Sequence, residues 1–511
     1  MRSGIADYSA DLLPFLGEHC DLRLVHLPEQ PISGEINRRY RVVAAELAGI
    51  GDRLPIYQMG NNPYHSAVAE LARDRPGVLV LHDLVLHHLL VEGTLKEGDF
   101  NAYHESLTAE HGWLGEAAAR PRRWPGGWAD AAQFALPANR RLVASQRGVV
   151  VHNEWAAEQL REDVPGLEVR VVSMGVPLGP LANARAGQEL RQKYEIPADV
   201  PLLGSFGFQT PIKRTETAIR ALASPGLQDV HLLVAGQVAA ACDYLGTARA
   251  AGVEGRVHLL GFLPFNELEA AIAATDLCLN LRYPTAGETS ASLLRILAIG
   301  KAAIVSDHAQ ATELPDSCVV KVPLGDGEVE ALVRSLTELL QDPGTLAKMG
   351  EAARHHIATV HDPEASAQAM VEAWRDLAEV TPVGEVADPA WPTSLAWDRY
   401  EGDLEVDGTE DWRDGQRRRL KIRLRNRSAA RWLAAERGAG GIAIEVCLSG
   451  QDNILAPPWL ALPFDLDPGA EQTFEIVLRR PRGAARLRIE PHVFGDRGFS
   501  QMGGPTWDHE I

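Results

Sequence analysis

One stretch of the sequence limits the possible fold more than any other, and it covers residues 274–315. A short apolar run at 277–281 predicts a buried strand, and a polar loop of small residues follows it. Apolar residues at helical spacing over 293–297, closed by Gly300, predict a helix, and a second buried strand is expected at 302–305. A strand–loop–helix–strand unit of this kind is typical of a parallel α/β sheet.

The loop that opens this helix begins with Glu288, Thr289 and Ser290. Such a loop presents free backbone N–H groups and the positive end of a helix dipole at one point, so it predicts a binding site for an anionic phosphate. A carboxylate at Glu288 suits a neutral polyhydroxylated group beside the phosphate better than the phosphate itself. The alternative is that residues 288–290 only cap the helix.

This stretch resembles the donor-site signature of family-4 glycosyltransferases, which are retaining enzymes with the GT-B fold. Their usual pattern is a Glu, a Gly-rich turn and a second Glu on the following helix. Glu288 matches the first carboxylate to within one residue, and the turn that would face the phosphate is Thr289, Ser290 and Ala291. Arg295 stands where the family has the second Glu, which usually holds the ribose. The resemblance therefore implies the sugar-phosphate half of a donor site and departs from the family in the nucleoside half.

A second glycine-bearing loop follows the strand predicted at 202–206, and it contains Gly207, Lys213 and Arg214. Glycine lets a backbone approach a ligand closely, and a Lys at a helix start opposes the dipole unless an anion is present. This placement indicates a diphosphate partner, and an exposed Lys without a role is the alternative. By the resemblance, Lys213 matches the pyrophosphate-binding Lys of the family. The family's Arg after the first Gly is missing here, and Arg214 is the candidate for its charge.

Two further loops of the second half are implicated by the same resemblance. Gly236 follows the strand predicted at 230–235, and Phe262 follows the next one, at 257–260. In the family, these loops hold the nucleotide base by backbone contacts. Glu313 also matches the family pattern, and an ordinary loop carboxylate is an equal alternative.

The first part of the chain also alternates helices and strands. The expected helices are at 3–18, 99–118 and 138–146, and the expected strands are at 21–25, 54–58, 78–81 and 149–151. The pattern predicts a doubly wound parallel sheet whose ligand crevice lies at the carboxyl ends of its strands. Gly4 and His82 would both lie at that edge.

Three segments here, SGIADYSADLLPFL, YQMGNNPYH and GVLVLHDLVLHHLL, resemble the amino-terminal half of bacterial family-4 enzymes. The family places a sugar-contacting His after this strand, which implies that role for His82, whereas a lone His after a buried strand is by itself more often structural. The spacing of His87 and His88 from His82 does not put the three on one helical face, so we expect packing roles and no metal site. The family's first strand precedes the Ser-Gly segment, so we expect a start site placed too late or a trimmed chain.

The apolar spacing changes from helical to period two in the last part of the chain. Residues 326–380 predict helices, and those at 352–380 resemble the helices that cross back onto the first domain in the family. A Pro-rich linker is expected at 381–396. Period-two alternation then predicts a β-sandwich, which loosely resembles immunoglobulin-like modules of bacterial surface-polysaccharide enzymes through Asn426 and Trp432. The basic run at 413–431 indicates either a solvated strand face or a surface for an anionic glycan or lipid-phosphate acceptor.

The expected fold class is therefore α/β, with two doubly wound, Rossmann-like GT-B domains and a C-terminal all-β sandwich. The expected boundaries are 1–175 for the N-terminal, acceptor-side domain, 176–351 for the nucleotide-sugar donor domain, 352–380 for the crossing helices, 381–396 for the linker and 397–511 for the sandwich.

Composition narrows the class of function. The net charge of −19 argues against a nucleic-acid binder, whose phosphate contacts need clustered Lys and Arg. Five scattered cysteines indicate buried thiols in a reducing compartment, and no apolar run is long enough for a membrane span. With no visible signal peptide, we expect a cytoplasmic protein, and peripheral association with the inner membrane face stays open.

The resemblance implies a glycosyltransferase that moves a sugar from a nucleotide diphosphate to a glycan, lipid-linked or protein hydroxyl with retention of configuration, in surface glycan or glycoconjugate synthesis. Lys213, Glu288 and His82 would serve catalysis, with no metal and no cofactor. The alternative is a non-catalytic glycan-binding or assembly protein that keeps the GT-B scaffold. An epimerase or phosphorylase would need its own catalytic acid or cofactor Lys, and no such motif is present.

Overall fold

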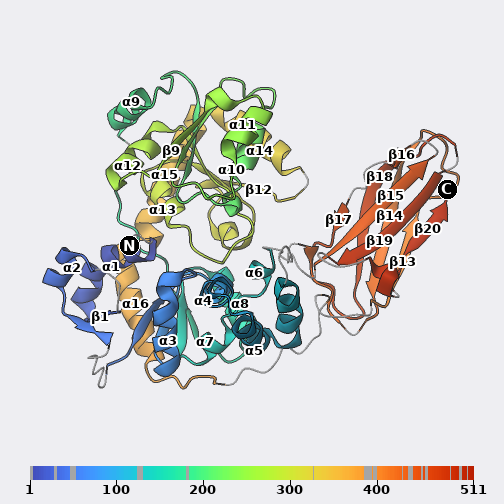
Figure 1. Cartoon of the computed structure of the whole chain (residues 1–511). Helices are drawn as coiled ribbons and strands as arrows, with labels where there is room; N and C mark the ends of the chain where they lie inside the picture. The colour runs from blue at the N-terminus through green and yellow to red at the C-terminus, as the bar shows by residue number, and fades with distance from the viewer. Residues whose placement is uncertain are drawn as a thin grey trace. The chain divides into compact units, whose positions relative to one another are not determined.

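The computed structural model describes residues 4–27, 32–45, 53–123, 131–179, 183–325, 327–384, 394, 400–428, 430–435, 441–450, 453–454, 459–483, 485–493, 498–502 and 504–511. The chain divides into two compact units. The first combines Met1–Gly60, Ala67–Leu84 and Leu142–Gly384, and the second combines Asn61–Ser66, Val85–Arg141 and Glu385–Ile511. Both large parallel sheets belong to the first unit (Figure 1).

The first parallel sheet has four strands in the order β3-β4-β5-β6. They are β3 (Ile56–Met59), β4 (Val78–Leu81), β5 (Gly148–Val151) and β6 (Val169–Val171). Every residue of β4 and β5 is buried, as expected for parallel strands that helices cover on both faces. Helix α3 (Ser66–Asp74) joins β3 to β4, and α8 (Glu154–Asp163) joins β5 to β6.

The strand expected at 21–25 is displaced and does not belong to this sheet. It is β1 (Leu24–His26), which pairs in parallel with β2 (Val42–Ala44) as a separate two-stranded sheet. The Arg53 guanidinium donates to the Asp21 carbonyl oxygen at 2.9 Å and so occupies the backbone where the strand was expected to start. Val25, in the middle of β1, is 41% exposed.

The second parallel sheet has six strands in the order β12-β11-β10-β7-β8-β9. They are β7 (Leu202–Phe206), β8 (His231–Ala235), β9 (Val257–Gly261), β10 (Leu277–Asn280), β11 (Ala303–Ser306) and β12 (Val319–Val322). The connecting helices are α10 (Thr215–Ala221), α11 (Tyr244–Ala250), α12 (Phe265–Ala274) and α13 (Ala291–Ala298), and α9 (Ala184–Lys193) precedes β7. The strand order reverses between β7 and β10, and ligands of such sheets bind outside the strand ends at that point.

Three long helices follow the second sheet. They are α14 (Glu328–Gln341), α15 (Pro343–Val360) and α16 (Pro363–Leu377). Helix α16 packs against α1 (Gly4–His19), where the His19 Nε2 atom lies 2.7 Å from the Glu364 Oε1 atom. Trp374 and Leu377 of α16 join a core that also contains Leu12 of α1, so the end of this region packs on its beginning.

Residues Val85–Arg141 belong to the second unit and are mainly helical. Its helices are α4 (His87–Gly93), α5 (Phe100–Ala119), α6 (Ala131–Ala135) and α7 (Arg140–Ala144), the last of which continues into the first unit. His87 is fully buried, donates from Nδ1 to the Leu136 carbonyl at 2.8 Å and accepts at Nε2 from the Tyr103 hydroxyl at 2.8 Å. Burial lowers the pKa of His87 to about 3, so this ring is neutral and serves packing. His88 contacts the Asn61 amide and the ring of Phe134.

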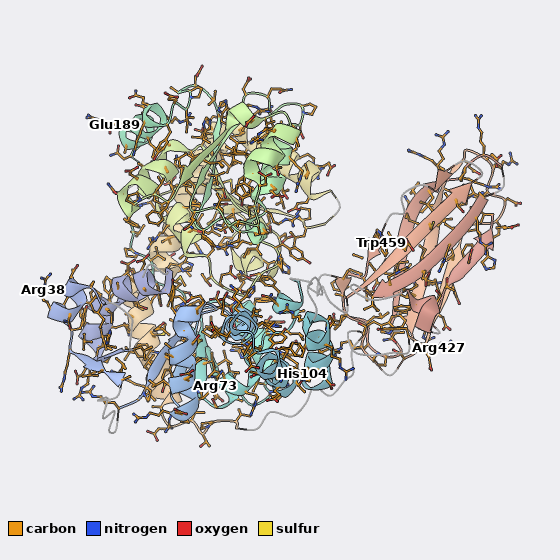
Figure 2. All side chains as sticks on the ribbon, in the orientation of Figure 1. Arg38, Arg73, His104, Glu189, Arg427 and Trp459 are labelled. Atoms are coloured by element: carbon orange, nitrogen blue, oxygen red, sulfur yellow. The ribbon has the colours of Figure 1, made fainter. Side chains whose placement is uncertain are left out.

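The C-terminal region is an antiparallel sandwich (Figure 2). One sheet contains β13 (Gly402–Asp407), β14 (Arg417–Asn426) and β18 (Glu471–Arg479); the other contains β15 (Ile442–Gly450), β16 (Asn453–Ile454), β17 (Trp459–Ala461), β19 (Ala485–Val493) and β20 (Trp507–Glu510). Alternate residues such as Leu420, Ile444 and Ile489 are buried between the sheets. The linker expected at 381–396 lies mostly outside the described residues.

Asn426 and Trp432 have structural roles in this sandwich. The Asn426 side-chain amide donates to the carbonyls of Ala430 and Leu466, both at 2.8 Å, and Trp432 is fully buried with its Nε1 donating to the Ser428 hydroxyl at 3.0 Å. These bonds satisfy polar groups that would otherwise be buried without partners.

The basic strand β14 is matched by acidic neighbours. Arg419 pairs with Glu475 on β18, and Arg423 pairs with Glu405 and Asp407 on β13. Part of the positive charge of this face, that of Arg419 and Arg423, is therefore offset by neighbouring carboxylates, as in a solvated strand face.

Among the described helices, none is long and apolar enough to cross a membrane.

Packing of α15 on the end of α13 gives a first prediction. A Cβ atom at Gly350 would lie 2.1 Å from the carbonyl oxygen of Gly300, a backbone atom that cannot move aside alone. Gly350→Ala should therefore destabilise the chain by about 1–3 kcal/mol, although alanine favours helices more than glycine does. The matched control is Gly255→Ala, where a Cβ atom meets nothing within 4 Å. Equal urea unfolding midpoints for the two variants would contradict this packing.

Candidate functional site

The start of α13 is the centre of the candidate site. Gly287 has a φ of +79°, and a Cβ atom there would lie 2.6 Å from the Cβ atom of Leu84, so the turn before α13 requires glycine. Ser290 is the N-cap residue, and its hydroxyl accepts from the Leu293 amide at 3.3 Å. Capping by Ser290 satisfies one amide of the first turn, and the other amides of a first turn have no partner inside the helix.

Lys213 lies buried beside the glycine loop after β7. It ends a short 3-10 helix, η5 (Pro211–Lys213), one residue before Arg214 and two before α10. Its Nζ atom donates to the Phe206 carbonyl at 2.7 Å, and a Cβ atom at Gly207 would lie 3.2 Å from that nitrogen. A Cβ atom at Gly236 would lie 1.9 Å from the Gly207 carbonyl oxygen, so close packing of these loops requires both glycines.

Burial lowers the pKa of Lys213 well below its usual range, the Arg282 guanidinium lowers it further, and the Glu288 carboxylate opposes both. An ammonium group without a nearby anion is unfavourable in such surroundings. An anionic ligand placed beside Lys213 would raise this pKa.

Glu288 is held by three neighbours. Its carboxylate forms an ion pair with Arg282 and accepts from the Thr285 hydroxyl at 3.2 Å and the Ala286 amide at 3.0 Å. The same guanidinium donates through Nη2 to the Ser290 hydroxyl at 3.1 Å. Both charged side chains are only 17% exposed. Arg282 thus links Glu288 to the start of α13.

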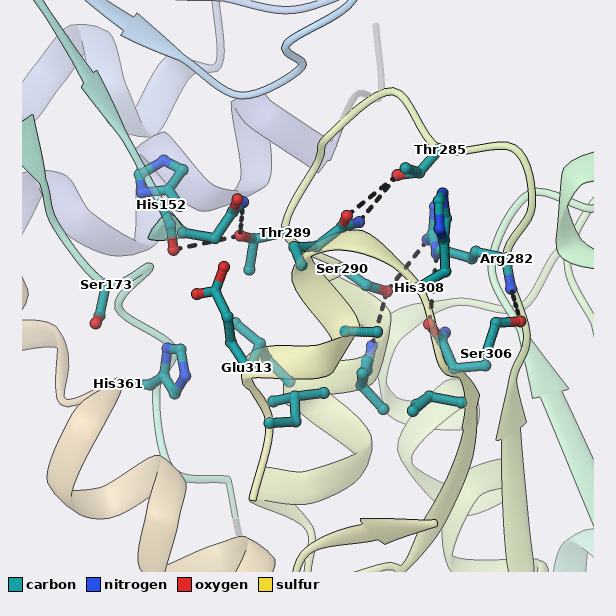
Figure 3. Close-up of a pocket in the computed structure, with 18 of the residues that line it drawn as sticks. His152, Ser173, Arg282, Thr285, Thr289, Ser290, Ser306, His308, Glu313 and His361 are labelled. Atoms are coloured by element: carbon teal, nitrogen blue, oxygen red, sulfur yellow. Dashed lines mark hydrogen bonds between the residues drawn. The ribbon is translucent and has the colours of Figure 1, made fainter. Parts of the chain in front are cut away.

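Arg282 and Ser290 line a cavity (Figure 3), and Lys213 and Glu288 are not among the residues that line it. In the figure, Arg282, Ser306 and His308 lie on one side of it, and Glu313 and His361 lie on the other. The residues lining it include Asn153, Asn280, Thr285, Thr289, Ser290 and Gln310. Most are uncharged hydrogen-bonding groups, which suit a hydroxyl-rich ligand.

Several predicted residues lie elsewhere or make other contacts. Arg214 forms two hydrogen bonds with Glu328, whose side chain is 4% exposed. Arg295 points to Asp11 on α1, with 3.5 Å between the charged atoms, and to the ring of Phe265. Phe262 follows β9 and is 58% exposed. The donor-binding roles predicted for these side chains remain predictions.

Of the other predicted residues, Gly4 begins α1, and a Cβ atom there would meet nothing within 4 Å. Ala291 is the first residue of α13. Thr289 accepts from the Asn153 amide at 3.1 Å and donates to the His152 carbonyl at 3.4 Å. These two bonds tie the start of α13 to the loop after β5.

Glu313 makes a contact of the same kind. Its carboxylate accepts from the amides of Glu154 and Trp155, at 3.1 and 2.7 Å, and so caps the N-terminus of α8. Glu313 therefore has the structural role of a loop carboxylate, which was the alternative to a donor-site role.

His82 belongs to a cluster of three rings at the carboxyl edge of the first sheet. Its Nε2 donates to the Gln58 side chain at 2.7 Å, and its ring contacts those of Tyr8 and His152 at centroid distances of 5.2 and 4.9 Å. His152 donates from Nδ1 to the Val172 carbonyl at 2.9 Å. Within the described part of the chain, the Nε2 atom of His152 and the Tyr8 hydroxyl are buried without a hydrogen-bond partner.

Arg282 and His152 are the residues that the sequence analysis missed. The sequence pattern could have identified both. Arg282 follows an apolar strand in LNLRYP, and His152 follows one in VVVHNE. His82 had the same signal, and parallel strand ends gather such residues at one edge.

Residues 187–356 match the family model described as "Glycosyl transferases group 1". The match shows that this segment, which is less than half of the chain, is similar to group 1 glycosyltransferases. It contains Lys213, Arg282, Glu288 and α13, so the candidate site lies inside the matched region. No curated protein sequence matches the chain.

Solved structures resemble about three quarters of this chain. Sucrose-phosphate synthase from Thermosynechococcus elongatus is 17% identical, with 73% of this chain and 94% of that chain covered and a TM-score of 0.53. HepE from Anabaena, solved with UDP and glucose, is 16% identical, with 73% and 96% covered and a TM-score of 0.49. The likeness to the first of these concerns the fold, and with the observed sheets it confirms the predicted GT-B architecture with an all-β C-terminal region.

The ring cluster predicts a pH effect on stability. Burial lowers the pKa of His152 from 6.5 to about 4, with the Val172 hydrogen bond opposing and His361 adding to the shift. The unfolded chain binds a proton here below pH 6.5 and the folded chain does not, so this stability is complete above pH 6.5 and is lost as the pH falls toward 4.

His152→Phe keeps a ring but removes the titrating group. Its loss of unfolding free energy between pH 7 and pH 5 should be about 2 kcal/mol smaller than that of the unmodified chain. Urea unfolding at both pH values measures this, with the exposed His355→Phe as control. An unchanged pH dependence in His152→Phe would show that the ring is charged when folded.

Proposed function

We propose that this protein transfers a sugar from a nucleotide diphosphate to a hydroxyl acceptor with retention of anomeric configuration, as a family-4 glycosyltransferase. The observation that carries the proposal is the start of α13, where Thr289 and Ser290 line a cavity together with Arg282. Glu288 pairs with Arg282, and Lys213 is buried against the Phe206 carbonyl of the loop after β7. Buried positive charge suits the diphosphate, and a carboxylate among neutral polar groups suits sugar hydroxyls. The group 1 match to the same residues supports this assignment.

Charge stabilisation is the main catalytic contribution that we assign to the chain. As the glycosidic bond breaks, negative charge grows on the leaving diphosphate while the sugar becomes oxocarbenium-like. Lys213, the amides of residues 289–291 and the dipole of α13 would stabilise that growing charge more than they stabilise the ground state. Burial lowers the pKa of Lys213, and a diphosphate beside it would oppose that shift and favour the protonated form.

The sugar would lie between the two sheets. We assign Glu288 to the sugar hydroxyls and His82 to a contact from the first sheet. Support for a hydroxyl near His82 comes from the adjoining His152 Nε2 and Tyr8 hydroxyl, two buried polar atoms without partners among the described residues. No protein nucleophile is needed if the leaving phosphate accepts the proton of the acceptor hydroxyl.

The acceptor is assigned only by class, as a glycan, lipid-linked or protein hydroxyl, and we place the reaction in the cytoplasm or at the inner membrane face in surface glycan synthesis. The C-terminal sandwich is assigned as an immunoglobulin-like accessory module.

One observation favours a second candidate, a non-catalytic glycan-binding protein. Arg295 stands where the family has its ribose-binding Glu, and its guanidinium faces Asp11.

Removal of the charged groups tests the assignment. Lys213→Ala and Glu288→Ala should each lower turnover by roughly 100-fold or more, the usual effect of losing one group that stabilises transition-state charge. Turnover would be followed as release of free nucleotide diphosphate from UDP-, GDP- and ADP-sugars. Wild-type turnover in both variants would refute the assigned site, and no turnover by the unmodified chain with any acceptor would favour the binding protein.

Metal dependence is a separate prediction. We propose that Lys213 and the α13 dipole supply the positive charge that a divalent cation supplies in other sugar-nucleotide sites. Activity should therefore persist in EDTA and should change little when magnesium or manganese is added. Loss of activity in EDTA with recovery on addition of either metal would contradict this.

A further inference from the structure

Arg282 is the charged side chain of the cavity to which the family resemblance gives no role. It follows β10 by two residues, and its backbone amide donates to the Ser306 hydroxyl at 3.1 Å. Its guanidinium lies between the Glu288 carboxylate and the Ser290 hydroxyl. Strand β10 borders the point where the strand order reverses, so the strand itself delivers this group to the start of α13.

The charges around Arg282 do not balance. An arginine stays protonated at any physiological pH, and Lys213 is close enough that Arg282 lowers its pKa. Glu288 is the one carboxylate that forms an ion pair with Arg282 among the described residues. With Lys213 protonated, two cations face one carboxylate in a region where both Arg282 and Glu288 are 17% exposed. An anion between them would restore the balance.

We propose that Arg282 is the second diphosphate-binding cation of the site, and that it reaches the diphosphate by leaving Glu288. Its departure frees the Glu288 carboxylate to accept hydrogen bonds from the donor sugar. Arg282 thereby couples the binding of the two halves of the donor, and it supplies the charge that the loop around Gly207 and Phe208 lacks. This inference rests on the proposed function, because it assumes a nucleotide diphosphate in the same cavity.

The exchange of partners is physically reasonable. A guanidinium binds phosphate oxygens through two parallel hydrogen bonds, and a diphosphate carries more negative charge than one carboxylate. The dipole of α13 attracts the anion to the same place. The Ser290 hydroxyl holds Nη2 at the helix start, so only a short rotation of the fork is needed to change partners.

Arg214 is the competing candidate for this charge, and its contacts argue against it. Two of its nitrogens bond to Glu328, which is almost fully buried at the start of α14. Breaking that pair would leave a buried carboxylate without its cation, which is costly. Arg282 gives up a partner that the sugar hydroxyls can then satisfy.

Calorimetric titration with nucleotides tests the first part. UDP, GDP and ADP are each titrated into the unmodified chain, and the tightest is compared with its monophosphate. Arg282→Ala should weaken diphosphate binding by roughly 10- to 100-fold, the range for one lost charge-assisted hydrogen bond, and weaken monophosphate binding less. Arg282→Lys, which keeps the charge without the fork, should lie between. The control Arg249→Ala removes an exposed cation paired with Glu254 and should bind normally.

Glu288→Gln tests the coupling. Because this change releases Arg282 from its ion pair, diphosphate binding should become several-fold tighter, while transfer of the sugar is lost. In an Arg282→Ala background, the same change should alter diphosphate affinity by less than twofold, since the effect acts through Arg282. A simple loss of repulsion between Glu288 and the phosphate would instead persist in the double variant.

The outcomes separate the two proposals. If no nucleotide diphosphate binds the unmodified chain, the proposed function fails, and this inference fails with it. If the diphosphate binds and Arg282→Ala binds it equally well, the proposed function stands and the role of Arg282 is wrong. If Arg282→Ala weakens binding but Glu288→Gln does not tighten it, the exchange of partners is wrong. Monophosphate binding that persists, weakened less than diphosphate binding, would show that Arg282→Ala is folded.

Discussion

Positive charge held in a poorly solvated place is the constraint on which the candidate site depends. Lys213 is buried against a backbone carbonyl, and Arg282 lies beside it with most of its surface covered. Removing such groups from water is unfavourable unless an opposite charge compensates them. The chain supplies only part of that compensation, through Glu288. The uncompensated positive charge is therefore the strongest indication that the site binds an anionic ligand.

The sheet topology makes this arrangement possible. Strands β7 and β10 are neighbours at the point where the strand order reverses. The loops that follow these two strands therefore begin side by side at the same edge of the sheet. Two glycines, Gly207 and Gly287, bring the backbone of these loops close to their neighbours, with positive φ angles that other residues adopt at a cost. Helix α13 then directs its N-terminus at the same point. Strand order, glycine placement and helix direction thus combine to concentrate positive potential at one edge.

Much of this architecture could be predicted from the sequence because parallel strands are buried on both faces. Such strands appear as continuous apolar runs, and those of β4, β5, β7 and β10 were found close to their observed bounds. The pairing of β1 with β2 was not predictable, because short, half-exposed strands leave no such run. The contacts between side chains were the hardest feature to predict from the sequence. Arg295 meets Asp11 across a long sequence separation, and the contact between Arg282 and Glu288 depends on how a loop folds back.

We propose above all that a nucleotide diphosphate occupies the space between Lys213 and the first turn of α13. A crystal structure of the chain with the tightest-binding of UDP, GDP and ADP measures this directly. The account predicts phosphate oxygens within hydrogen-bond distance of the Lys213 Nζ atom and of the amides at residues 289–291. A nucleotide bound elsewhere, with Lys213 still bonded only to the Phe206 carbonyl, would contradict it.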